Sequence, residues 1–178
     1  MFSRRAFAIG AVSATAAAAA TWKETRAGEQ AKGTFPVTKS DADLHKLLSK
    51  EQYYVLRDHG TERAFSSPLD KNYAAGEYHC AGCKALLFTS DAKFDSGTGW
   101  PSFFKPVENA VGIKSDRSFF MVRTEVHCAT CGGHLGHVFP DGPAPTGQRY
   151  CMNGVAMTFV PKAEGADETA GTRTPPKS

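Results

Sequence analysis

Two C-x-x-C pairs limit what this chain can fold into more than any other feature of its sequence. Cys80 pairs with Cys83, and Cys128 pairs with Cys131. Two intervening residues let one turn, here called a knuckle, present both sulfurs to the same ion, and two knuckles complete the tetrahedron of a structural zinc site. Residues 84–127, which separate the knuckles, exceed the linker of a compact zinc ribbon. We therefore expect several strands between the knuckles and a metal ion that joins distant parts of the chain.

Four thiolates fill every ligand position, so the predicted zinc ion is structural and leaves no open position for a substrate. The residues alone leave alternatives. Two disulfides could form in an oxidising compartment, whereas a redox C-x-x-C is disfavoured because neither pair lies in a βαβ context. His79 and His127 each precede a knuckle cysteine and could replace a ligand. A complete set of sulfurs instead favours a place for both imidazoles outside the ligand set.

The N-terminus indicates export. Residues 3–7 (SRRAF) resemble a twin-arginine signal, residues 6–20 are apolar and rich in alanine, and residues 25–27 (TRA) offer a cleavage site. We predict that residues 1–27 are a signal segment that is removed, which places the protein in the periplasm or otherwise outside the cytoplasm. The apolar stretch is shorter than the roughly 20 residues of a membrane span. No stable membrane insertion is expected after removal, and a tether through an uncleaved N-terminus is the alternative.

The rest of the chain is predicted to form one domain at residues 39–162. A flexible lead at residues 28–38 precedes it, and residues 163–178, rich in Ala, Glu, Thr, Pro and Gly, are expected to be a disordered tail. The chain has 21 Lys and Arg against 18 Asp and Glu, of which the signal segment carries four and one, so 17 of each remain. A body this close to neutral has no basic face that would predict a nucleic-acid partner.

Two short helices are expected at the start of this domain. Ser40 can cap the first, and Ser49 with Gln52 matches a capping box for the second, which should stop at Gly60. From residue 77 onward, short apolar runs separated by Gly, Pro, Asp and Ser predict a mostly β body. The helices should pack through Leu44, Leu47, Leu48, Tyr53, Val55 and Leu56, and strands are expected at Tyr78, 86–88, 119–122 and 155–160.

The fifth cysteine, Cys151, has no partner within a motif. A buried structural cysteine is the plainest interpretation of a lone Cys. However, Arg149 and Asn153 lie two residues to either side, and on a strand all three side chains would share one face. A neighbouring cation lowers the pKa of a thiol and raises its thiolate fraction. His134 and His137, spaced by three, lie upstream and could serve as acids, which favours a catalytic role over a structural one.

At this point the sequence resembles a known family, the B-type methionine sulfoxide reductases. The resemblance runs from about Leu44 to Pro161, and its motifs are specific in combination. Besides the two knuckles they are 51–53 (EQY), 60–63 (GTER), 94–103 (FDSGTGWPSF), 123–126 (RTEV), 134–139 (HLGHVF), 141–143 (DGP) and 149–153 (RYCMN).

The resemblance implies an enzyme that reduces the R epimer of methionine sulfoxide in proteins, with the free amino acid as a further candidate substrate. It implies a mainly β fold of two small antiparallel sheets, a β-tent, with short N-terminal helices and the structural zinc site. It also implies that Cys151 is the nucleophile and that Trp100 seats the substrate methyl group, for which a core tryptophan is the alternative. We expect Phe139 and Arg149 to contact substrate as well. The residues implied in proton delivery are His134, His137, Asp141 and Asn153.

The chemistry of the reaction agrees with these residue types. A sulfoxide sulfur is a poor electrophile until its oxygen is protonated, so the site needs a nucleophilic thiolate, an acid and an apolar pocket. Cys151 would attack the sulfur while His137, together with His134, protonates the oxygen. Asp141 could orient or charge an imidazole. Methionine would leave, and Cys151 would become a sulfenic acid.

Two positions depart from the family pattern. Thr98 stands where many members carry a resolving cysteine, and Gly154 stands where serine is usual. The chain has five cysteines, so if four hold zinc the sulfenic acid has no internal partner. We therefore predict regeneration by an external thiol, such as a thioredoxin-like protein. The expected partners are this reductant and oxidised proteins bearing methionine sulfoxide, and the protein is expected to be a monomer.

Two other functions compete with this assignment. A non-catalytic zinc-ribbon module would also use paired C-x-x-C motifs, but the near-neutral body and the histidines near Cys151 argue against it. A thiol–disulfide oxidoreductase would need an exposed reactive cysteine pair, which zinc coordination would remove. Zinc content and a count of free thiols would separate these possibilities.

Overall fold

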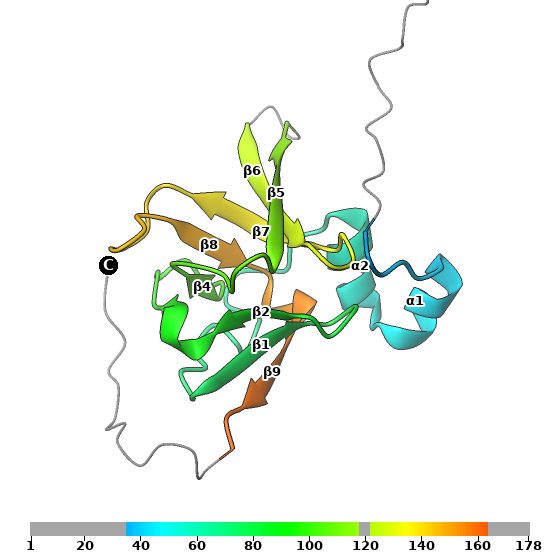
Figure 1. Ribbon diagram of the computed structural model, residues 1–178, viewed down its shortest axis with the longest axis horizontal. Helices are drawn as coiled ribbons and strands as arrows, with labels where there is room; N and C mark the ends of the chain where they lie inside the picture. The colour runs from blue at the N-terminus through cyan, green and yellow to red at the C-terminus, as the bar shows by residue number, and fades with distance from the viewer. Residues whose placement is uncertain (1–34, 118–121, 164–178) are drawn as a thin grey trace, which may run out of the picture. The chain divides into compact units, whose positions relative to one another are not determined.

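The computed structural model describes residues 35–117 and 122–163. Within them, two α-helices are followed by nine strands that pair into two antiparallel sheets (Figure 1). This confirms the predicted mainly β fold with two sheets and short N-terminal helices. The signal segment at 1–27, part of the lead (28–34) and nearly all of the tail (164–178) lie outside the described residues. Among the described residues, no helix has the length and apolar character needed to cross a membrane.

Both helices begin as their sequences predict. Helix α1 spans Asp41–Leu47 and helix α2 spans Lys50–Asp58. The Ser40 hydroxyl accepts the Asp43 N–H at 3.2 Å and caps α1. Ser49 and Gln52 exchange both hydrogen bonds of a capping box, at 3.2 and 3.0 Å. These bonds satisfy backbone N–H groups that have no partner within the helix.

The end of α2 lies one residue before the predicted stop. His59 adopts the left-handed conformation, with φ of 56°, and Gly60 then donates its N–H to the Tyr54 carbonyl at 2.9 Å. Histidine is uncommon at such a position, which glycine usually fills. A second difference concerns the apolar stripe of α1, because Leu44 is buried but Leu47 is 47% exposed.

The smaller sheet has three strands in the order β2-β1-β9. Its central strand, β1, therefore pairs with one strand that follows it closely and with the last of the described strands. The register brings Cys80 opposite Met157 and Tyr78 opposite Phe159. The bounds are β1 (Gly76–Cys80), β2 (Leu86–Thr89) and β9 (Met157–Pro161).

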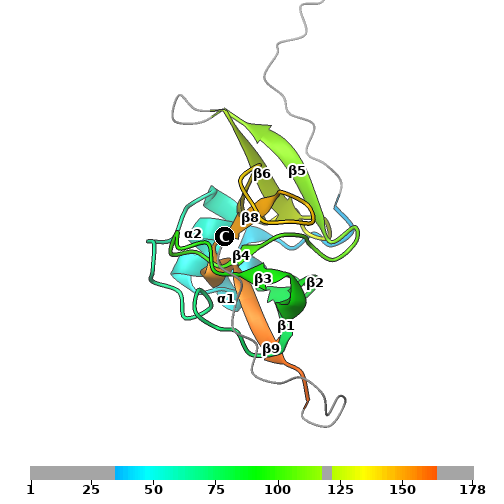
Figure 2. The same ribbon diagram turned by 90° about the vertical axis from the view of Figure 1, so that its left-hand side faces the viewer.

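The larger sheet has six strands in the order β3-β4-β8-β7-β6-β5. Figures 1 and 2 show the small sheet on one side of β4 and β8 and the β5–β6 hairpin on the other. The strands are β3 (Lys93–Phe94), β4 (Ser102–Phe103), β5 (Val111–Asp116), β6 (Arg123–Cys128), β7 (His134–Phe139) and β8 (Arg149–Met152).

Two predicted strands differ from the observed ones. The run at 119–122 falls mostly on residues 118–121, which lie outside the described residues, and Val122 precedes β6 and is 79% exposed. The run at 155–160 begins with a 3-10 turn at Gly154–Ala156, so β9 starts only at Met157. Gly154 therefore lies in this turn and not in a strand.

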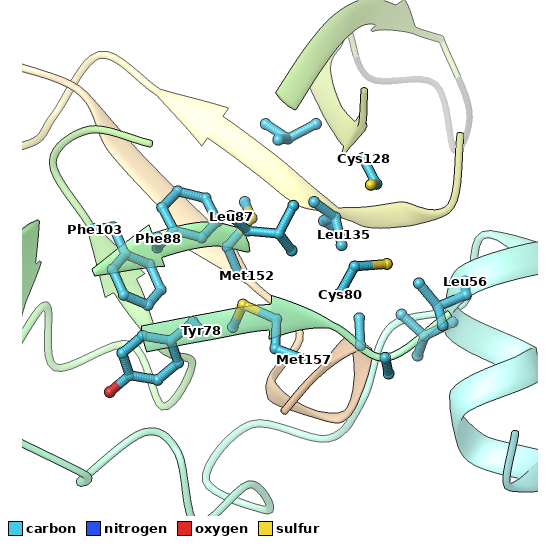
Figure 3. Packing of buried hydrophobic residues seen from close by; sticks show 14 of the residues in the cluster. Leu56, Tyr78, Cys80, Leu87, Phe88, Phe103, Cys128, Leu135, Met152 and Met157 are labelled. Carbon is cyan, nitrogen blue, oxygen red and sulfur yellow. The ribbon is translucent and has the colours of Figure 1, made fainter. Parts of the chain in front are cut away.

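The hydrophobic core lies between the two sheets. Phe103 of β4 stacks on Phe88 of β2, with ring centroids 4.3 Å apart, and meets Tyr78 of β1 edge-on at 4.9 Å. Figure 3 shows these rings at one end of the core and Cys80, Cys128 and Leu56 at the other. All are fully or almost fully buried. The core thus changes along its length from aromatic side chains to sulfur.

Candidate functional site

The four knuckle cysteines meet at the sulfur end of the core. The Sγ atoms of Cys80 and Cys131 are 3.7 Å apart, those of Cys83 and Cys128 are 3.6 Å apart, and all four lie within 4.8 Å of one another. A disulfide needs sulfurs about 2.05 Å apart, whereas a tetrahedral zinc ion with Zn–S bonds of about 2.3 Å holds them roughly 3.8 Å apart. The cluster therefore has the spacing of a metal site and not of two disulfides.

The two knuckles have the same backbone geometry. In each, the first cysteine accepts the N–H of the residue four positions on and donates to the carbonyl of the residue five positions on, at 2.8 to 2.9 Å. The residue that follows the second cysteine adopts the left-handed conformation in both knuckles: Lys84 has φ of 66° and Gly132 has φ of 71°. Glycine adopts this conformation without strain, whereas lysine does so at a cost. The first knuckle therefore carries backbone strain that the second does not.

Helix α2 covers both knuckles through Leu56. A Cβ at Gly133 would lie 2.9 Å from the Leu56 side chain, and one at Gly82 would lie 3.7 Å from it. The small residues thus let the helix approach the sulfurs closely. His79 and His127 are outside the four-cysteine cluster, as predicted, and His79 instead bonds the Lys84 carbonyl and Glu77.

The second knuckle is also the turn of the β6–β7 hairpin. β6 ends at Cys128, and β7 begins at His134, three residues after Cys131. The strands that carry the predicted proton donors are therefore held together at one end by the cysteine cluster. From that end they extend toward β8 and Cys151.

A row of polar side chains crosses the large sheet from β5 to β4. Register pairs Lys114 with Glu125, Glu125 with His137, His137 with Cys151, and Cys151 with Ser102. Residues directly opposite each other in antiparallel strands share a face, with Cβ atoms roughly 4.5–5.5 Å apart. The predicted nucleophile thus lies between an imidazole and a hydroxyl on the same face, here called the reactive face.

A bulge in β7 brings the second histidine to the same face. His134 and His137 are three residues apart, which in a regular strand would place them on opposite faces. The register shifts, however: His127 pairs with His134 and Val126 pairs with Gly136, so Leu135 is the extra residue. The two imidazoles consequently lie 5.4 Å apart between ring centroids.

His137 is oriented by a carboxylate on β5. Its Nε2 lies 2.8 Å from an Asp116 oxygen, which also accepts from Arg123 at 2.8 Å. This contact places the proton of the neutral ring on Nε2. Burial lowers the pKa of His137, although the bond to Asp116 opposes that effect. At neutral pH the ring is therefore mostly neutral and able to accept a proton.

His134 is oriented by Glu125, which binds three donors. His134 Nδ1 lies 2.9 Å from Glu125 Oε1, His59 Nδ1 lies 3.3 Å from the same oxygen, and Lys114 lies 3.1 Å from Oε2. Burial raises the pKa of Glu125, but these three partners outweigh it and hold that pKa well below its usual range. Nε2 of His134 is buried and has no hydrogen-bond partner among the described residues.

Hydroxyl groups surround Cys151 on its other side. Thr98 Oγ1 lies 4.0 Å from the sulfur and 2.8 Å from Ser96 Oγ, which is 2.7 Å from Ser102 Oγ. Burial raises the pKa of the Cys151 thiol, and the attraction of Arg149 and the hydroxyl bonds only partly offset it. Arg149 therefore lowers the pKa of this thiol in the expected direction, but the thiol does not have a lowered pKa in the resting protein, because burial is the larger effect.

Asp141 does not orient an imidazole as predicted. Its two oxygens accept from Arg149 at 2.9 and 2.8 Å, a bidentate pair. The Arg149 guanidinium also lies over the Phe139 ring at 4.5 Å. Arg149 and Phe139 face each other across β8 and β7. The carboxylate therefore fixes the arginine, while Asp116 and Glu125 orient the histidines.

Asn153 lies beyond the end of β8 and so does not share a strand face with Cys151 as predicted. Its amide donates to the Leu135 carbonyl at 3.0 Å, and its oxygen accepts the Glu62 N–H at 2.9 Å. The side chain is buried. It therefore joins the bulged part of β7 to the loop that contains Glu62.

Glu62 is a site residue for which the sequence analysis assigned no role, although it lies in the GTER motif. Its carboxylate accepts the N–H groups of Gly154 and Val155 at 2.7 and 2.8 Å, and its carbonyl accepts the indole N–H of Trp100 at 3.2 Å. Burial raises the pKa of Glu62, although the two hydrogen bonds from backbone N–H groups oppose this effect. Glu62 thus holds half-buried Trp100 in place.

Comparison with known proteins shows which family this chain resembles in sequence. A sequence model of the SelR domain matches residues 48–161. The peptide methionine sulfoxide reductase MsrB of Agrobacterium fabrum is 58% identical over 126 residues, covering 70% of this chain and 93% of that protein. The MsrB of Methanosarcina barkeri is 55% identical over 130 residues, covering 72% and 92%. The MsrB of Leptospira interrogans is 55% identical over 126 residues, covering 70% and 96%.

Proposed function

The chain belongs to the SelR family of MsrB-type peptide methionine sulfoxide reductases, and from that premise we propose that Cys151 reduces the R epimer of methionine sulfoxide in oxidised proteins. The observation that carries the proposal is the register of the large sheet, which places Cys151 directly opposite His137 on the reactive face. A non-catalytic zinc-ribbon module would have no use for this pairing or for the carboxylates behind the imidazoles.

The resting protonation states suit the first step. The thiol of Cys151 has a raised pKa and His137 a lowered one, so the proton rests on sulfur and the imidazole is neutral. His137 takes this proton as Cys151 attacks the sulfoxide sulfur. Asp116, bonded to Nε2, stabilises the imidazolium that forms. The thiolate is thus generated only when substrate is present.

The second step delivers the same proton to the sulfoxide oxygen. The attack forms a bond between the Cys151 sulfur and the substrate sulfur. This S–S bond and the S–O bond of the substrate then break as the protonated oxygen passes to Cys151, so the substrate sulfur gains two electrons and the cysteine sulfur loses two. One thiol and one sulfoxide become one sulfenic acid and one methionine thioether. His134, held by Glu125 through Nδ1, stands beside His137 and assists the transfer.

The substrate methyl group and its oxygen need different surroundings. Trp100, fixed by Glu62, offers an apolar ring, and Phe139 offers a second one beneath Arg149. The Arg149 guanidinium is held by Asp141 in a single orientation and can stabilise negative charge on the oxygen or the attacking sulfur. We assign these three side chains to substrate binding.

Regeneration requires an external reductant. Thr98, in the loop at residues 95–101 between β3 and β4, lies 4.0 Å from the Cys151 sulfur and cannot form a disulfide. The other four cysteines are gathered in the cluster. A dithiol protein of the thioredoxin class therefore attacks the sulfenic acid, becomes a disulfide, and releases water and the Cys151 thiol.

We assign zinc to the four-cysteine cluster. The sulfur spacing fits a tetrahedral ion, and the full set of thiolates leaves no position for substrate. When bound, zinc would supply structural cross-linking of β1 to the β6–β7 hairpin. Its ligands would be Cys80, Cys83, Cys128 and Cys131.

The proposal is tested by an assay with separated sulfoxide epimers in a model peptide and a dithiol reductant. We expect turnover of the R epimer, no turnover of the S epimer, and no turnover of either by Cys151→Ser. As a control for folding, the Cys151→Ser protein should have the same metal content as the wild type. Unchanged turnover in this variant would refute the mechanism. Turnover of only the S epimer would refute the stereochemistry.

Residues 1–27 remain a predicted twin-arginine-type signal, and we propose that the protein acts outside the cytoplasm as a monomer. The support for export is the pattern of residues 1–27. Fractionation of cells that make the full chain should recover a shortened protein in the exported fraction. Replacing Arg4 and Arg5 together by lysine should leave the full-length chain inside. A full-length protein in the membrane fraction would instead indicate a tether.

A further inference from the structure

Three potential metal ligands meet where helix α2 approaches the reactive face, in a group separate from the four-cysteine cluster. His59 from the end of α2, Glu125 from β6 and His134 from β7 place one ligand atom each within 4.8 Å of the others. The rings of His59 and His134 are 5.2 Å apart between centroids. The proposed reaction uses His134 but has no role for His59. The approach of the His59 imidazole to Glu125 is therefore unexplained by catalysis.

The distances suit a small ion. Zinc bonds of about 2.0–2.2 Å to nitrogen and oxygen place tetrahedral ligand atoms roughly 3.3–3.5 Å apart. His59 Nδ1 already lies 3.3 Å from Glu125 Oε1. His134 Nδ1 lies 2.9 Å from the same oxygen, so this contact must open slightly, and all three ligand atoms already lie within 4.8 Å of one another. The ion would replace the two N–H donors that now share Oε1.

Burial and charge favour binding at this position. The side chains of Glu125 and His134 are 4% and 2% exposed, so two of the ligands are already fixed and desolvated. His59 is 53% exposed and gives an ion access from solvent. Lys114 binds the other carboxylate oxygen, Oε2, and so need not leave. Two imidazoles with one carboxylate select zinc, nickel or copper over magnesium or calcium.

We propose that His59, Glu125 and His134 form a second binding site for a divalent transition-metal ion. Metal binding here takes His134 Nδ1 from its hydrogen bond with Glu125 and fixes the ring as a ligand. This part rests on the proposed function: a ligated His134 no longer assists proton transfer, so the ion inhibits turnover. Free transition metal would then act as a reversible brake on the reductase.

The binding test uses the zinc-loaded full chain, with one zinc per protein confirmed beforehand, and Co²⁺ as the probe. Cobalt binds such sites more weakly than zinc and so should leave the cysteine cluster intact. We expect one Co²⁺ per chain with d–d absorption and without thiolate-to-cobalt charge-transfer bands. His59→Asn should lower the affinity at least about 10-fold, since loss of even a supporting group costs that much at metal sites.

Asparagine is chosen because it tolerates the left-handed backbone of His59. The matched control is His45→Asn, which removes another exposed histidine, the one that stacks on Tyr53, and should bind Co²⁺ as the wild type does. Glu125→Gln should abolish binding. Absence of bound Co²⁺ on the zinc-loaded chain, equal affinity in His59→Asn, or thiolate bands in the spectrum would each overturn the site.

The inhibition test adds excess Zn²⁺ to the reductase assay. Turnover by the wild type and His45→Asn should fall, whereas His59→Asn should resist at the same concentration. Equal inhibition of His59→Asn would overturn the brake while the spectroscopic result stands by itself. A protein with no reductase activity at all would contradict the proposed function and leave the Co²⁺ measurement unaffected.

Discussion

The chain uses cysteine in two regions with opposite consequences. At one end of the core, four sulfurs converge from two matched knuckles, and each lies within 4.8 Å of the others. On the reactive face, Cys151 has hydroxyls, an imidazole and a guanidinium around it. The comparison shows that the surroundings decide the role, because the residue type is the same. Four sulfurs gathered together favour binding of a metal ion. A single sulfur beside an imidazole that can accept its proton remains available to react.

The two regions also differ in how tightly their geometry is fixed. The cluster is held by two backbone turns with the same hydrogen bonds, so its geometry is local. The reactive face takes its residues from five strands and depends on the register of the whole sheet. A change at the cluster should therefore alter stability, and a change at the reactive face should alter chemistry.

The largest effect is expected when the cluster loses a ligand. Cys128→Ser should lose the metal and unfold, because structural zinc contributes about 10–16 kcal/mol in zinc-finger peptides, which matches the whole stability of a typical domain. Metal analysis and thermal unfolding followed by circular dichroism would measure this. Cys151→Ser is the matched control and should keep both metal and melting temperature. A metal-free Cys128→Ser protein that melts like the wild type would break the comparison.

On the reactive face, Asp116→Asn should lower kcat at least about 10-fold, a part of the 10²–10⁴-fold that a positioned acid–base group contributes. Asp116 raises the pKa of His137 against burial, so its loss lowers that pKa further. The acidic limb of the pH–rate profile should consequently move to lower pH. Asp141→Asn is the control, and it should mainly raise KM through Arg149. A larger fall in kcat for Asp141→Asn would reverse the assignment.

Thr98→Cys should give the reactive face a second sulfur without turning it into a metal site. The new Sγ would lie near the position of Oγ1, 4.0 Å from the Cys151 sulfur, so the loop must move by about 2 Å to form a disulfide. Mass spectrometry of the variant after one turnover should show the loss of two hydrogens. Thr98→Ser should show none. A sulfenic acid that persists in Thr98→Cys would contradict this expectation.

Alkylation should separate the two kinds of cysteine in one sample. In the folded, metal-bound protein only Cys151 should react, and its pKa is raised by burial. The alkylation rate of Cys151 at neutral pH should therefore be lower than that of free cysteine. As the pH is raised, this rate should increase with a midpoint above about 8.5, the pKa of free cysteine. Unfolding with a chelator present should expose all five thiols. Faster reaction than free cysteine at neutral pH would show that Arg149 outweighs burial.

The smallest expected effect concerns the difference between the knuckles. Lys84 holds the left-handed conformation that glycine holds in the second knuckle. Lys84→Gly should raise the free energy of unfolding of the metal-bound protein by up to about 1 kcal/mol, because it removes this strain. Chemical denaturation would measure the change. Lys84→Ala keeps the strain and should give no gain, and an equal gain there would point to the lysine side chain instead.

Local patterns predicted the cluster and the helix starts well. The knuckles and the capping box depend on residues two or three positions apart, and such short-range geometry is nearly independent of the rest of the fold. Even here the end of α2 differed, because histidine took the left-handed position before Gly60. The two-sheet arrangement came from the family resemblance and not from the periodicity of the residues.

The partners of the imidazoles could not be predicted from local pattern. Asp116 and Glu125 reach His137 and His134 only through the strand order β5-β6-β7 and through the bulge at Leu135. Asp141 is closer in sequence to both histidines, which made it the natural candidate, but it pairs with Arg149 instead. A sequence shows which carboxylates exist, whereas the sheet register decides which imidazole each one meets.

The pairing of β1 with β9 sets the order in which the molecule can be completed. β1 contains Cys80. One of its two neighbours, β9, is the last strand of the domain and places Met157 opposite Cys80. During synthesis the ribosome therefore releases the four clustered cysteines and Cys151 before the small sheet can close. A nascent chain halted just before Met157 would lack β9 and would leave β1 without one of its two partner strands. Quality control by proteases would then act on a chain that already carries all of its functional residues.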